Sequence, residues 1–147
     1  MEEVITLNEK ALKAIYKEYS THNRDDILKK YNADYMILED CVDLLKFHCP
    51  LRVSRYLIRE AYALSKMTVL AEHDAKAELA YKKLQYVEFL EFLARIADLF
   101  FEGSEMEGLE LHEKIEHILD EILPLVGAKR VKQKIVIEEF SESDDDY

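Results

Sequence analysis

Apolar residues recur at three- and four-residue steps along most of the chain, and this spacing places them on one face of an α-helix. The most apolar stretch is 84–101, where aromatic and aliphatic side chains extend well beyond a narrow stripe. A helix that is apolar almost all round is normally buried, so we expect this one at the centre of the fold. Its four charged residues exclude a membrane span, and Gly103 predicts its end.

The same periodicity predicts a fold of the all-α class with about five main helices. Their expected ranges are 7–20, 38–47, 51–65, 86–101 and 109–126. Thr6 and Glu9 have the spacing of a capping box, which predicts that the first helix starts there. Pro50 separates the second helix from the third, and Pro124 with Gly127 ends or kinks the last one. The stretch 67–83 is rich in helix formers and is expected to be a loop that contains some helix.

Composition adds that the chain is one domain with a tail. With three Gly and two Pro in 147 residues, long helices are favoured over a multi-stranded sheet. We therefore divide the chain into a helical domain, 1–128, and a basic, apolar and then acidic tail, 129–147. Six acidic residues among the last ten account for over half of the net charge of −11. The basic cluster before them is small, so nucleic acid is not an expected partner.

The cysteines and the N-terminus bear on location. Cys41 and Cys49 have no second pair with which to form a zinc site, and we expect buried free thiols. No apolar segment follows Met1, so no secretory signal is visible. These features predict a cytoplasmic protein that does not bind a membrane.

Two stretches 48 residues apart align position by position. One is Leu84-x-x-x-Glu88-Phe-Leu-Glu91, and the other is Met36-x-x-x-Asp40-Cys-Val-Asp43. Each has the form of the end of an EF-hand loop that runs into its exiting helix, and a predicted helix precedes each of them. The pattern therefore predicts an EF-hand-like helix-loop-helix pair followed by a C-terminal helix. The competing interpretation is an ordinary helical bundle in which the motif is a coincidence.

The loops themselves lack calcium ligands. With Glu88 and Asp40 as the last ligand position of each loop, the earlier positions hold Ala77, Leu79 and Tyr81, and Lys29, Tyr31 and Ala33. Lys82 and Asp34 stand where a glycine turn is needed. A calcium loop requires oxygen ligands and that glycine, so we expect no metal and no cofactor. A calcium-responsive sensor of the EF-hand class is kept as the alternative function.

A resemblance to a known family supports the helix-loop-helix interpretation. The pattern Leu-x-x-x-Glu-Phe-x-Glu-x-x-x-Arg-Ile-Ala at 84–97, with the segments 61–67 and 111–123 around it, resembles EF-hand-like segments of axonemal and other ciliary proteins. The likeness covers roughly 36–126. It implies a structural component of the ciliary axoneme or cytoskeleton, a scaffold with protein partners in a larger assembly. Because the loop ligands are missing, calcium sensing does not carry over.

No arrangement with catalytic spacing accompanies these features, and we predict that the chain is not an enzyme. His112 and His117 lie five residues apart, whereas a zincin helix needs its two histidines four apart. A metal site also needs three or four convergent ligands, so both are interpreted as residues of a solvated face. A metal hydrolase or redox carboxylate enzyme remains the third hypothesis.

The tail carries the predicted partner-binding residues. They are the apolar side chains Ile135, Val136, Ile137 and Phe140, placed between basic and acidic residues. Such a segment has too little to pack against within itself, and it suits docking on a partner as an extended strand or linear motif. Ser141 and Ser143 each precede an Asp by three residues, which predicts phosphorylation by an acidophilic kinase. The alternatives are a tail that lies back on the domain and a tail that is only solubilising.

Overall fold

The computed structural model describes residues 2–20, 35–66 and 83–131. The α-helices in these ranges are α1 (Glu2–Leu7), α2 (Glu9–Ser20), α4 (Leu38–Val42), α5 (Arg55–Lys66), α7 (Tyr86–Phe100) and α8 (Leu111–Ile122). A π-helical segment, Asp43–His48, continues α4, and a 3-10 turn, Leu123–Val126, continues α8. In the described ranges β pairing is limited to an isolated bridge between Met36 and Leu84. The predicted all-α fold class is confirmed.

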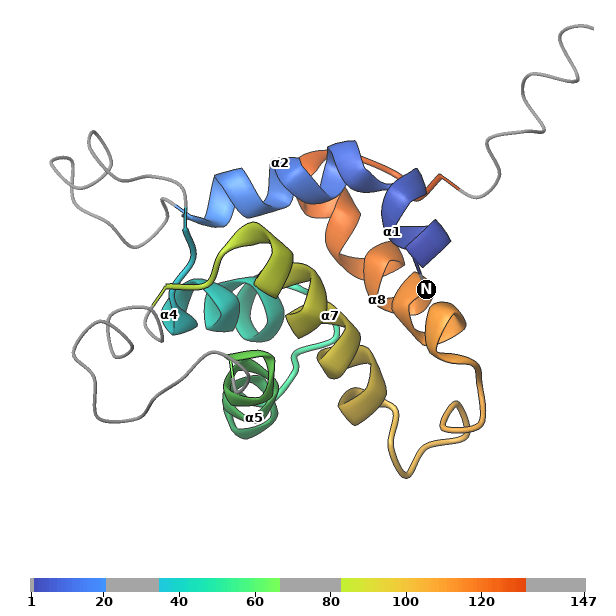
Figure 1. Cartoon of the computed structure of the whole chain (residues 1–147). Helices are drawn as coiled ribbons and strands as arrows, with labels where there is room; N and C mark the ends of the chain where they lie inside the picture. The colour runs from blue at the N-terminus through green and yellow to red at the C-terminus, as the bar shows by residue number, and fades with distance from the viewer. Residues whose placement is uncertain (1, 21–34, 67–82, 132–147) are drawn as a thin grey trace, which may run out of the picture.

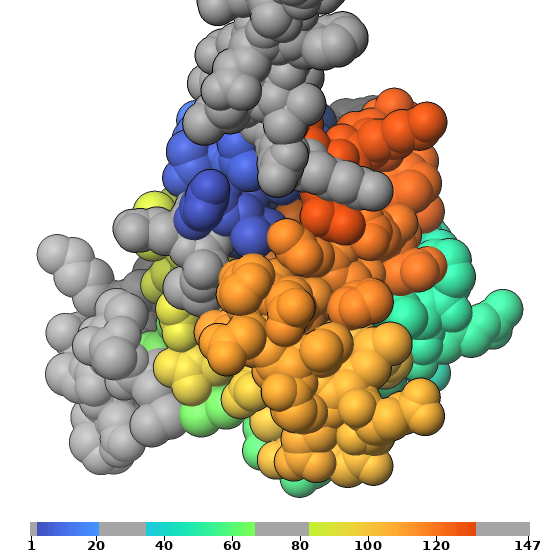
Figure 2. Space-filling view, turned by 90° about the vertical axis from the view of Figure 1, so that its right-hand side faces the viewer, coloured from blue at the N-terminus to red at the C-terminus, as the bar shows by residue number. Residues whose placement is uncertain are grey.

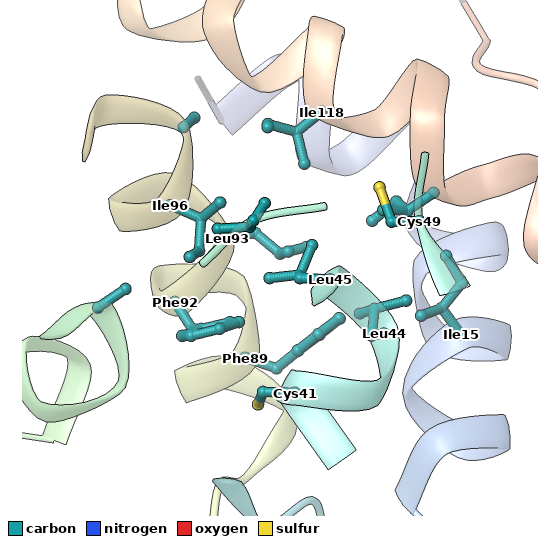
Figure 3. Packing of buried hydrophobic residues seen from close by; sticks show 14 of the residues in the cluster. Ile15, Cys41, Leu44, Leu45, Cys49, Phe89, Phe92, Leu93, Ile96 and Ile118 are labelled. Atoms are coloured by element: carbon teal, nitrogen blue, oxygen red, sulfur yellow. The ribbon is translucent and has the colours of Figure 1, made fainter. Parts of the chain in front are cut away.

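Helix α7 lies at the centre, as its apolar sequence predicts. It packs against α5 on one side and α8 on another, and it also contacts α2 (Figure 1). Phe89, Phe92 and Leu93 on this helix have no exposed surface. Figure 3 shows them facing Leu44 and Leu45 of the π-helical segment across the core. Helices α5, α8 and α2 therefore all pack on α7, and its burial organises the domain.

The predicted start of the first helix is wrong. The chain is already helical from Glu2, so Thr6 lies inside α1 and Asn8 separates α1 from α2. The Asn8 side chain is buried and donates through Nδ2 to the carbonyl oxygen of Val4 at 2.9 Å. Its Oδ1 accepts the backbone N–H of Val131 at 2.7 Å. This amide holds the break between the helices and ties the N-terminal segment to the end of the described chain.

The third helix begins later than predicted. Helix α5 starts four residues after the expected position 51 because the chain first makes a turn. The N–H of Val53 donates to the carbonyl of Leu45 at 2.9 Å, which holds this turn against the preceding segment. Ser54 then caps the helix, since its Oγ accepts the N–H of Leu57 at 3.2 Å.

The C-terminal end of the helical domain follows the prediction closely. Pro124 stands at the start of the 3-10 turn, where its missing N–H does no harm. Gly127 has a φ of 72°, a left-handed conformation that glycine adopts without steric cost, and it ends the turn. Arg130 then turns back to Asp120 of α8, with 2.8 Å between its Nε and Oδ1.

Candidate functional site

The two stretches that align at a spacing of 48 residues, which begin at Met36 and Leu84, lie side by side in the structure. Met36 and Leu84 are fully buried and form the antiparallel bridge. The N–H of Met36 donates to the carbonyl of Leu84 at 3.0 Å, and the N–H of Leu84 donates back at 2.7 Å. Tyr16 of α2 adds a hydroxyl donor to the same Leu84 carbonyl at 2.7 Å. Residues at equivalent positions of the two stretches are therefore directly paired.

The acidic residues four positions after the bridge perform the same task in both stretches. Asp40 accepts the N–H of Ile37 through Oδ2 at 2.8 Å, at the start of α4. Glu88 accepts the N–H of Gln85 through Oε1 at 2.8 Å, at the start of α7. Each carboxylate satisfies a backbone donor that the first helical turn leaves free. The aligned pair thus begins two equivalent exiting helices.

The helices before these stretches repeat each other as well. Helices α2 and α5 each have 12 residues and bury the same positions, with a spacing of 46 residues. The buried pairs are Leu12 with Ile58, Ile15 with Ala61, Tyr16 with Tyr62, Tyr19 with Ser65, and Ser20 with Lys66. We call residues 9–48 the first unit and residues 55–100 the second unit. This repeat is not visible in the sequence because only the tyrosine pair is identical.

The second unit contains a buried charge that sequence analysis did not single out. The side chain of Lys66, the last residue of α5, is 1% exposed. Its Nζ donates to the carbonyl of Lys83 at 2.7 Å and to Oε1 of Glu88 at 2.8 Å. A buried ammonium is costly unless it is paired and hydrogen-bonded, and this one is both. The contact joins the end of α5 to the start of α7.

The first unit connects its helices differently. Ser20 stands at the position of Lys66, and its Oγ donates to the carbonyl of Lys17 at 3.0 Å. The hydroxyl of Tyr19 lies 2.7 Å from Nδ1 of His48, at the end of the π-helical segment. Burial, and then the nearby acidic charges of Glu18 and Asp43, raise the pKa of Tyr19. This hydroxyl therefore stays protonated and links the entering helix to the exiting one.

Several grooves mark the surface of the described residues, and two of them lie beside α5 and α2. One, of about 640 Å³, lies between α4 and α5, and its lining residues are Leu38, Tyr56, Arg59, Glu60, Tyr62 and Ala63. The other, of about 310 Å³ and mainly apolar, is lined by Leu7, Asn8, Lys10, Ala11, Ala14, Val126, Ala128 and Val131. We call this second one the terminal groove. Figure 2 shows the face where the N-terminal helices and the chain from 111 onward meet.

The predicted site residues of the tail, Ile135, Val136, Ile137, Phe140, Ser141 and Ser143, lie outside the described residues. The same holds for the predicted loop positions between 29 and 34 and between 77 and 82. His117 packs edge-on against Phe101, with 5.9 Å between the ring centroids. Within the described ranges, no three His, Cys, Asp or Glu side chains are placed to hold one metal ion.

The described part of the chain contains no helix that is both long and apolar enough to cross a membrane.

A calcium ion, which the EF-hand resemblance would imply, does not fit the second unit as it is built. Among the described residues, the Glu88 carboxylate and the Lys83 carbonyl are oxygen groups that such an ion would use. Both already accept hydrogen bonds from the ammonium of Lys66. A divalent ion beside that ammonium would meet strong repulsion.

No protein-family model, curated protein or solved structure matches this chain. The class of protein is therefore inferred from its own repeated units and grooves.

Proposed function

We propose that this chain is a non-catalytic protein-interaction module, a scaffold built from two EF-hand-like units. In this proposal it is a structural component of a larger assembly, of the kind that a ciliary axoneme contains. The observation that carries the proposal is the terminal groove, because the chain passes along its wall and continues directly into the apolar tail.

The pairing of the two units supports the EF-hand-like class. Each unit has an entering helix and an exiting helix, and the segments before the two exiting helices meet in the Met36–Leu84 bridge. The acidic caps Asp40 and Glu88 follow at the same distance from that bridge. An ordinary bundle with a coincidental motif would have no reason to repeat the bridge position, the cap and the burial pattern together.

The terminal groove gives the tail a fixed starting point. The N–H and the carbonyl of Val131 both face the Asn8 side chain, at 2.7 Å and 3.5 Å. Only three residues separate Val131 from the first apolar residue of the tail, Ile135. A partner strand or helix that binds the tail is thus brought beside the apolar wall of Ala11 and Ala14. Groove and tail together supply more apolar surface than either supplies alone.

Deletion of residues 135–147 tests this docking. We expect the truncated chain to keep its helical circular dichroism and its melting temperature but to lose its main partner in a pull-down from a ciliated cell. Equal recovery of that partner with and without the segment would show that the tail does not dock.

A matched pair of variants tests the groove. Ala14→Arg places a long charged side chain in the terminal groove, while Ala63→Arg does the same in the groove between α4 and α5. Both alanines lie on helices at positions that are not fully buried, so folding should survive. We expect Ala14→Arg to reduce partner recovery and Ala63→Arg to leave it unchanged. The reverse result would move the docking surface to the α4–α5 groove.

A further inference from the structure

We propose that the ammonium of Lys66 is a built-in cation that occupies the ion position of the second unit. It replaces the metal ion that would otherwise fix the entering and exiting helices relative to each other. The inference rests on the EF-hand-like pairing proposed above. It adds a chemical explanation of how the second unit holds α5 against α7 without a metal ion.

The geometry identifies the position. In a calcium loop, the seventh residue supplies a backbone carbonyl and the twelfth supplies a carboxylate. With Glu88 as the twelfth residue, the seventh is Lys83. These are the two groups that hold Nζ of Lys66, the carbonyl at 2.7 Å and the carboxylate at 2.8 Å. The ammonium is therefore bound by the same pair of oxygen groups that would contact a calcium ion.

The chemistry of an ammonium suits a loop with few ligands. An ammonium carries one positive charge and three N–H donors, so one carboxylate and a carbonyl satisfy much of its requirement. Calcium takes six to eight oxygen ligands, and the sequence has Ala77, Leu79 and Tyr81, none of them acidic, at the positions that normally supply carboxylates. A singly charged cation that belongs to a lysine side chain needs fewer acidic ligands than calcium does. This explains why these positions hold no acidic residues.

Because the cation belongs to a side chain, the contact does not depend on the concentration of a dissolved ion. A metal ion dissociates when its concentration falls, but Lys66 is part of α5 and stays beside Glu88 at a high effective concentration. The second unit is therefore expected to hold one arrangement of α5 and α7 at all calcium levels. The first unit has Ser20 at the equivalent position, so the inference applies to the second unit alone.

A double-mutant cycle tests whether the charge matters beyond packing. Lys66→Met keeps an unbranched side chain one atom shorter and removes its charge, and Glu88→Gln keeps the shape of the carboxylate side chain. We expect Lys66→Met to lower the midpoint of urea unfolding strongly in the native background and only slightly in the Glu88→Gln background. Equal shifts in both backgrounds would overturn the proposal, because Lys66 would then act through packing.

Chemical rescue gives a second, independent measurement. Lys66→Ala removes the atoms that n-propylammonium supplies, whereas 1-propanol supplies a chain of the same size without charge. We expect propylammonium to raise the melting temperature of Lys66→Ala by several degrees, with little effect from propanol or on the native chain. Equal rescue by propanol, or no rescue by either, would contradict a cation site. If Lys66→Ala does not fold in either solution, the double-mutant cycle decides.

These experiments and the tail deletion test the two proposals independently. Partner recovery that does not need the tail, together with strong coupling between Lys66 and Glu88, would overturn the docking proposal alone. Loss of the partner without the tail, together with no coupling, would overturn the built-in cation alone.

Discussion

The first and second units share a pattern of buried positions and an acidic cap, but they differ in the contact that joins their helices. Both bury the same five positions of the entering helix, and both begin the exiting helix with an acidic cap. The second unit joins its helices through the buried ion pair of Lys66 and Glu88, whereas the first uses the hydroxyl of Tyr19 and the ring of His48. The shared buried positions therefore define how the helices of a unit are arranged, while the polar contact that joins those helices differs between the two units.

The largest expected difference between the units concerns one pair of equivalent core positions. Phe89 and Cys41 are both fully buried and stand at the same position of their exiting helices. Phe89→Ala should reduce the free energy of unfolding by about 3–5 kcal/mol. Cys41→Ala removes a single heavy atom and should cost only about 1 kcal/mol. Urea unfolding of the two variants measures this difference in unfolding free energy. Equal losses would mean that the Phe89 ring contributes no more to the core than the Cys41 thiol.

Another pair of positions should respond alike. Leu45 and Leu93 are equivalent, are both fully buried and face each other across the core (Figure 3). Replacement of either by Ala should cost about 2–5 kcal/mol, because it leaves a cavity that neighbours fill only partly. Glu91→Ala is the control, since this exposed residue pairs with the equally exposed Arg95 and should change stability by less than about 0.5 kcal/mol. A silent Leu93→Ala would contradict the central placement of α7.

Much of this architecture follows from local pattern. The burial of α7 could be predicted because its apolar residues are close together in sequence and fill one continuous helix. The alignment of Asp40 with Glu88 could be predicted because each lies next to apolar residues of its own helix. The stop at Gly127 also depends only on neighbouring residues.

The remaining features depend on partners far along the chain. The break at Asn8 is held by Val131, 123 residues later, so the local capping pattern at Thr6 was misleading. The start of α5 is set by the bond between Val53 and Leu45. Lys66 lies just past the predicted helix 51–65, and its pairing is not visible in the sequence because its partner, Glu88, is 22 residues away. Pairings of this kind are determined by tertiary packing, which periodicity does not encode.

A smaller effect is expected where α2 meets the bridge between the units. Tyr16→Phe removes the hydroxyl that donates to the Leu84 carbonyl at 2.7 Å, and it should cost about 0.5–1.5 kcal/mol. Tyr56→Phe is a suitable control because Tyr56 is 76% exposed. Thermal unfolding of both variants measures the difference, and indistinguishable melting temperatures would show that the hydroxyl adds nothing to the contact between units.

Alkaline pH should distinguish the units by titration. Burial, and then the negative charge of Asp40, raise the pKa of the Cys41 thiol well above its ordinary value of 9.0, while its equivalent Phe89 does not titrate. The unfolded chain releases this proton near the ordinary value, but the folded chain keeps it. Stability from this group is therefore complete below pH 9.0 and is lost as the pH rises above it. In Cys41→Ala the unfolding free energy should fall less as the pH rises above 9.0. If its dependence on pH is unchanged, groups other than Cys41 cause the alkaline loss of stability.

The central claim is that this helix-loop-helix pair holds its shape without an ion, and calcium itself tests it most directly. A ligand that binds the native state stabilises it by mass action, by about 2.7 kcal/mol at a hundred times its dissociation constant. We predict that the melting temperature of the full chain is the same in millimolar calcium and in excess chelator. A rise of several degrees with calcium would contradict the account.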